Sequence, residues 1–171
     1  CELHREEFSR RAGKGLSLTE FSQAFSQEGE PHPYRKIWLE TACDTMAGLA
    51  ERLGETVHQT APQTRIGLMS SAPESHCVEG RDWERMLKAI SGPGKPLNRP
   101  HLPGYNDMAS IRYAIHFQRF SRLTAAVTKG LAELWPEVEN FPHSRFSKSH
   151  RFTKLQIEST LALCAGGITL N

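Results

Sequence analysis

The spacing of apolar residues alternates along the chain between a helical and a strand-like pattern. Helical spacing is clearest in two long stretches, from Pro33 to about Thr60 and from about Asp107 to Lys129. Shorter helices are predicted within residues 2–15, 17–25, 82–90 and 151–167. Ser17 and Glu20 have capping-box spacing, and Pro62 is expected to end the first long helix.

Each helical pattern predicts a buried stripe. The expected stripes are Ile37, Trp38, Ala42, Leu49, Leu53 and Val57 in the first long helix, Trp83, Met86, Leu87 and Ile90 in the short central helix, and Met108, Ile111, Ile115 and Leu123 in the second long helix.

Short apolar runs between these helices predict strands, which begin near Arg65, Leu97, Leu134 and Ile168. The second run contains three prolines, which favours a brief strand that leads into a loop. The four starts are separated by 32, 37 and 34 residues, close to the roughly 31 residues per βα unit of a barrel. A Gly-rich phosphate turn is absent, and GPGK at 92–95 is interpreted as a plain turn. We therefore predict an α/β domain over 1–171, the second half of a (β/α)8 barrel with parallel strands alternating with helices.

Composition narrows the classes of partner. Twenty-one basic against 19 acidic residues give a net charge of +2, which argues against a surface-wide nucleic-acid binder. Four scattered cysteines without a C-x-x-C pair are expected to be reduced, which favours a cytoplasmic protein. Both ends look cut, so a preceding segment with a signal peptide stays an alternative. No apolar run approaches the roughly 20 residues of a membrane span, and no cofactor is expected.

Functional side chains of a βα barrel lie where the strands end. The candidates at these positions are Ser70 and Ser71, Arg99 and His101, Glu139, and Asn171.

The segment WPEVENFPHSRFSKSHR, residues 135–151, carries the most specific signal. Glu139 is followed by Asn-Phe-Pro at the end of an apparent strand, and this E-x-x-P placement resembles the nucleophile segment of glycoside hydrolase family 42, the barrel β-galactosidases. Downstream, the helical pattern of 151–167 and the strand ITLN resemble the elements that form the last wall of the sugar site. Upstream, Cys1 and His4 resemble the Cys-rich segment that follows the acid-bearing fourth strand.

The resemblance implies a retaining glycoside hydrolase that acts on a carbohydrate. Such enzymes hold two carboxyl groups about 5 Å apart, one as nucleophile and one as general acid. Glu139 would be the nucleophile, and the acid would precede Cys1. Arg99 and His101 would bind sugar hydroxyls, Arg145 or Lys148 would keep the pKa of Glu139 low if either turns inward, and Asn171 would complete the sugar site.

Other interpretations remain open on the same residues. The alternative for Glu139 is a solvated loop carboxylate. Glu137 lies two residues earlier on the same side of a strand and ranks second as nucleophile, because a deeper position should be apolar or small. The basic segment 143–154, with Phe146 and Phe152, is alternatively an anion site or a nucleic-acid contact, although we expect no nucleic-acid partner. A barrel that binds carbohydrate without catalysis is a third alternative.

Cys1 and His4 supply too few ligands for zinc, so no metal is expected. Open strand edges predict a homo-oligomer.

Overall fold

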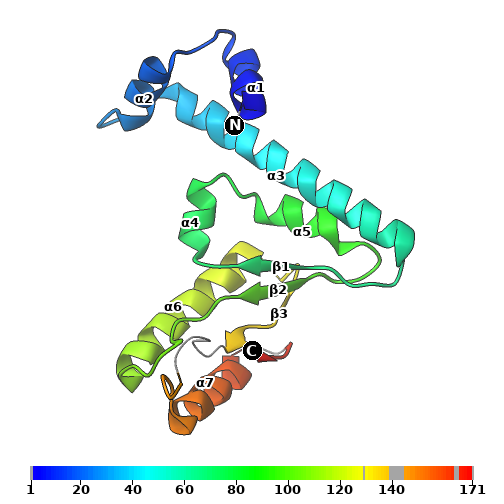
Figure 1. The fold of residues 1–171 in the computed structure, drawn as a ribbon, viewed down its shortest axis with the longest axis vertical. Helices are drawn as coiled ribbons and strands as arrows, with labels where there is room; N and C mark the ends of the chain where they lie inside the picture. Colours follow the sequence, from blue (N-terminus) through cyan, green and yellow to red (C-terminus); the bar gives the residue numbers. More distant parts are fainter. Residues whose placement is uncertain (1, 129, 139–144, 164–165, 171) are drawn as a thin grey trace.

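The computed structural model describes residues 2–128, 130–138, 145–163 and 166–170 as helices, short strands and their connections (Figure 1). The helices are α1 (Glu2–Ala12), α2 (Leu18–Ser26), α3 (Pro33–Thr60), α4 (Pro73–Val78), α5 (Trp83–Ser91), α6 (Ser110–Thr128) and α7 (His150–Leu163). The strands are β1 (Gly67–Ser70), β2 (Leu97–Pro100), β3 (Glu133–Leu134), β4 (Glu137–Val138) and β5 (Thr169–Leu170).

All strand pairs are parallel and follow the order of the chain. β1 pairs with β2 and β2 with β3, while β4 pairs with β5. A parallel bridge between His101 and Glu137 links the end of β2 to β4. Helices α4 and α5 connect β1 to β2, α6 connects β2 to β3, and α7 connects β4 to β5. The α/β class is confirmed: the chain combines helices with short parallel strands, and β3 and β4 follow one another without a helix between them.

The strand predicted to begin near Leu134 is divided into β3 and β4 at Pro136. Proline has no N–H to donate to a strand ladder. The Trp135 N–H still donates to the Asn98 carbonyl of β2 at 2.9 Å, whereas the Pro136 carbonyl accepts from Thr169 N–H at 2.9 Å. This segment therefore bonds to β2 on one side and to the β5 region on the other.

The three-stranded sheet has one covered face and one open face. Residues paired in a parallel register point to the same side, and the sides alternate along each strand. Ser70, Asn98 and Pro100 share one face and are buried under the helices. Met69 and Arg99 share the opposite face, on which the Met69 side chain is 66% exposed. The open face also carries the Arg65–Glu133 ion pair at 3.1 Å.

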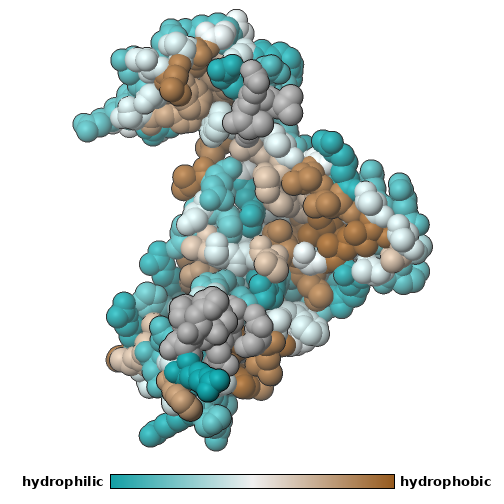
Figure 2. All heavy atoms as spheres, in the orientation of Figure 1, coloured by the Kyte–Doolittle hydropathy of each residue, from teal (hydrophilic) through white to brown (hydrophobic). Residues whose placement is uncertain are grey.

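Helix α3 packs against α5 through small residues rather than through leucines. Ala47, Ala50 and Gly54 are buried, and a Cβ added at Gly54 would lie 2.8 Å from the Ala89 carbonyl oxygen of α5. The predicted stripe was wrong at Leu49 and Leu53, which are exposed, because the close approach of the two helices selects the small face of α3. Figure 2 shows apolar surface over the region of α3 and α5.

The stripe predicted for α6 was also misplaced. Ile111 and Ile115 are exposed, whereas Tyr113 and Phe117 are buried against α7. These two rings form a core cluster with Leu102 and Phe152, to which Met108 and Leu155 add partly buried contacts. Large aromatic rings bury more area than the isoleucines, so they take the inward face. In the described part of the chain, no helix is long and apolar enough to cross a membrane.

Candidate functional site

A pocket of about 370 Å³ opens at the carboxyl ends of β1, β2 and β4. The open face of the sheet and the loops that follow β1 and β2 supply its wall. Its lining consists of Met69, Ser70, Ser71, His76, Arg99, His101, Tyr105 and Glu137. Carboxyl ends of neighbouring parallel strands meet at one edge of a sheet, which is where α/β proteins place their ligands.

Arg99 and Glu137 form an ion pair within this pocket. Arg99 Nη1 donates to Glu137 Oε1 at 2.5 Å, and the Glu137 side chain is only 6% exposed. Arg99 Nη2 also lies 3.2 Å from the Met69 sulfur. Glu137 is thus a charged residue at a buried position, where an apolar or small residue was expected, and the arginine from β2 compensates its carboxylate.

His101 and Tyr105 form the adjoining wall. Their rings lie 4.8 Å apart between centroids. The loop that carries Tyr105 is fixed from α7, because Gln156 Nε2 donates to the Gly104 carbonyl at 3.1 Å. Lys148 Nζ donates to Gln156 Oε1 at 2.5 Å and approaches the same carbonyl at 3.5 Å. Lys148 thus contacts the loop next to Tyr105 and is not among the residues that line the pocket.

The remaining predicted site residues are spread over different surroundings. Arg145 is exposed and is not among the residues that line the pocket. Glu139 and Asn171 lie outside the described residues, one position after β4 and β5 respectively. Within the basic segment, Phe146 is fully exposed, but Phe152 is buried in the core cluster and is not accessible to a nucleic-acid base.

The structure also shows three side chains in hydrogen-bonding contact that the sequence did not predict, those of Ser71, His76 and Glu79. The Ser71 hydroxyl lies 3.0 Å from His76 Nε2, and His76 Nδ1 lies 3.2 Å from Glu79 Oε2. The predicted strand end pointed to Ser71, but no helix was predicted in the segment directly after it. It forms α4 instead, which brings His76 back over the end of β1. The S-x₄-H-x₂-E spacing is the only signal for this contact, and it is not specific.

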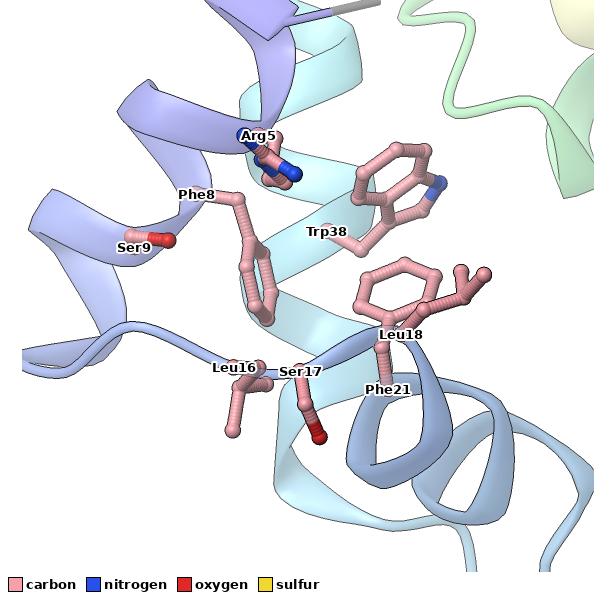
Figure 3. A pocket seen from close by; sticks show the side chains of 8 residues that line it. All are labelled: Arg5, Phe8, Ser9, Leu16, Ser17, Leu18, Phe21 and Trp38. Carbon is pink, nitrogen blue, oxygen red and sulfur yellow. The ribbon is translucent and has the colours of Figure 1, made fainter.

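A second pocket, of about 440 Å³, lies between α1, α2 and α3 (Figure 3). Phe8, Phe21 and Trp38 pack there edge to face, with ring centroids 5.1 to 5.9 Å apart. Its lining includes Arg5 but neither a carboxylate nor a histidine within the described ranges. We interpret this pocket as a feature of helix packing and place the candidate site at the strand ends.

In the described portion of the chain, no group of three or more His, Cys, Asp or Glu side chains is arranged to hold a metal ion. Comparison of the chain with models of known protein families, with curated proteins and with solved structures found no match.

Proposed function

We propose that the chain forms the second half of a (β/α)8 barrel of a retaining glycoside hydrolase. The observation that supports this most is the polar pocket at the carboxyl ends of parallel strands that follow one another in chain order. In a barrel, the open face with Met69, Arg99 and Glu137 would be the lumen, and the helices would form the outer ring. The resemblance of residues 135–151 to the nucleophile segment of family 42 supplies the reaction type.

In this proposal Glu139 is the nucleophile. It follows β4 by one position, and β4 contributes Glu137 to the pocket. The ionised carboxylate would attack the anomeric carbon and displace the glycosidic oxygen, which takes a proton from a general acid. Water would then release the sugar from the glycosyl-enzyme. The general acid is expected on a strand that precedes Cys1 in the full-length protein.

The pocket residues have defined roles in this scheme. Arg99 and His101 would bind sugar hydroxyls, and Asn171, directly after β5, would complete the site. Arg99 would also neutralise the negative charge of Glu137, which lies two residues before the proposed nucleophile Glu139. Lys148 would act as a positioning residue through the loop of Tyr105, and Arg145 would belong to the outer rim.

Glu137 is the competing candidate for the nucleophile, because it lies in the described pocket. Its carboxylate is paired with Arg99 at 2.5 Å and its side chain is only 6% exposed, so it presents little surface to a substrate. This burial favours a structural role for Glu137. A barrel that binds carbohydrate without hydrolysing it is distinguished from an enzyme by the experiment below.

The test compares Glu139→Gly and Glu137→Gly in the full-length protein on an aryl glycoside with a good leaving group. Loss of the nucleophile should lower hydrolysis by several orders of magnitude, and azide should restore turnover and give a glycosyl azide of inverted configuration. Azide rescue of Glu137→Gly alone would transfer the role to Glu137. Glu139→Gln that retains more than about a tenth of the wild-type rate would refute Glu139 as nucleophile.

We also propose that residues 1–171, expressed alone, associate. Within the described residues, β1 pairs only with β2, and β5 pairs only with β4. Strands with one unpaired edge add further strands readily. Sedimentation velocity should show oligomers. A monodisperse monomer with cooperative unfolding would contradict the half-barrel and favour a complete small domain.

A further inference from the structure

His76 is held rigidly at the rim of the strand-end pocket by contacts on three sides. Glu79 Oε2 lies 3.2 Å from Nδ1, the Ser71 N–H donates to Nε2 at 3.0 Å, and the ring lies 5.7 Å from that of Trp83 in an edge-to-face arrangement. The His76 side chain is 13% exposed. Such a fixed side chain can bind a ligand without first losing rotational freedom.

These contacts define the hydrogen-bonding character of each atom. The Glu79 carboxylate only accepts, so it fixes the imidazole proton on Nδ1 and leaves Nε2 as an acceptor. The Ser71 N–H takes the lone pair of Nε2. A histidine that acts as general base needs this lone pair to remove a hydroxyl proton. Although Ser71, His76 and Glu79 are connected like a nucleophile, a base and an orienting carboxylate, this arrangement is better suited to binding than to nucleophilic attack.

The charges around the pocket select a neutral ligand. Glu137 compensates Arg99, and Glu79 faces His76, so the lining offers no excess positive charge to an anion. The Ser71 hydroxyl, exposed on this lining, can donate one hydrogen bond and accept others. A sugar hydroxyl has the same dual capacity, which makes the two groups complementary.

We propose that Ser71 and His76 form a binding site for one hydroxyl group of a neutral sugar, with Glu79 as the positioning residue. The inference rests on the proposed function for the class of ligand, but it assigns a specificity role to a loop that the sequence resemblance does not include. The Ser71 hydroxyl contacts the sugar directly, and His76 accepts from the Ser71 backbone N–H and so fixes the position of this residue.

The experiment measures binding of D-galactose and of its monodeoxy analogues to the full-length protein by calorimetry, because these free sugars have no glycosidic bond to be hydrolysed. Ser71→Ala should weaken binding of galactose by about tenfold, the usual effect of one lost hydrogen bond, and should leave binding of one particular deoxy analogue unchanged. Ser75→Ala is the matched control, because Ser75 is exposed on α4 but does not line the pocket.

Glu79 is tested separately. Glu79→Ala should weaken binding and shift the imidazole nitrogen resonances of His76, whereas Glu79→Gln, which still accepts from Nδ1, should restore both. Thermal unfolding of each variant verifies that it is folded.

The outcomes separate this inference from the proposed function. If galactose binds, and the Ser71→Ala variant binds galactose and every analogue as tightly as the protein with Ser71 does, the inference is refuted while the glycosidase proposal stands. Equal losses for all analogues would also refute it, since no single hydroxyl would be involved. Labelling of Ser71 by a fluorophosphonate would show a reactive nucleophile instead of a binding group. If no sugar binds to any variant, both proposals fail.

Discussion

Arg99 Nη1 lies 2.5 Å from Glu137 Oε1, although the two residues are 38 positions apart in the chain. The pair joins β2 to β4 next to the bridge between His101 and Glu137. It also converts a buried carboxylate, which would be unfavourable alone, into a compensated group at the centre of the candidate site.

Removing one member of this pair should cost more stability than removing both. Arg99→Met leaves the Glu137 carboxylate buried without its cation, and the free energy of unfolding should fall by about 3 kcal/mol. The double variant Arg99→Met with Glu137→Met should regain part of this loss. Urea denaturation of the single and double variants measures the coupling. Additive effects would show that the two side chains do not stabilise one another.

Two glycines of α3 should respond in opposite ways to alanine. A Cβ at Gly48 meets nothing within 4 Å, so Gly48→Ala should stabilise the protein by about 0.5 to 1 kcal/mol through helix propensity. A Cβ at Gly54 would lie 2.8 Å from the Ala89 carbonyl oxygen, and Gly54→Ala should destabilise by about 1 to 3 kcal/mol because α3 and α5 must separate. Equal shifts in the thermal midpoint would contradict this packing.

Asp44 should make stability depend on acid pH. Hydrogen bonds from Arg85 and then Arg11 lower the pKa of the Asp44 carboxyl below its ordinary value of 3.8. Since the folded pKa lies below the unfolded one, the stabilisation is complete above the unfolded pKa and is lost as pH falls through the folded pKa. Unfolding measured from about pH 7 to about pH 3 should therefore show a smaller decline in Asp44→Asn than in the wild type.

The same comparison in ~1 M NaCl serves as the control, because these side chains are partly exposed and salt screens their attraction. The difference between the two proteins should become smaller there. An identical pH profile for both proteins at low salt would show that Asp44 does not couple α3 to α1 and α5.

Lys148 should affect substrate binding indirectly. Its ammonium group contacts Gln156 and the Gly104 carbonyl, next to Tyr105 of the pocket. Lys148→Met in the full-length protein should raise KM by about tenfold with a smaller change in kcat, because a displaced wall weakens ground-state and transition-state binding alike. Arg145→Met, at an exposed position three residues before Lys148, should change KM less. Equal losses for both variants would instead favour direct contact of residues 145–148 with the substrate.

The local pattern of the sequence determined the elements of this protein and their order. Helices at 33–60 and 82–90 and strands after residues 65, 96 and 168 follow from periodicity, caps and prolines, because these signals act between residues a few positions apart. The ends of the predicted strands also placed Ser71, Arg99 and His101 in the candidate pocket. The alternation of helix and strand was enough to predict parallel pairing.

Tertiary packing decided which faces are buried and which polar groups meet. In α3 the small residues around Gly54 face α5 while Leu49 and Leu53 stay exposed, since the distance between two helices depends on both surfaces. Tyr113 and Phe117 took the inward face of α6 in place of the predicted isoleucines, because their rings bury more area in the cluster with Phe152. Glu137 became a buried partner of Arg99, and His76 met Ser71, because register and the turn of α4 bring together groups that no local spacing connects. Contacts between distant segments depend on the whole packed structure, so a single sequence predicts the strand ends but not the pairs formed there.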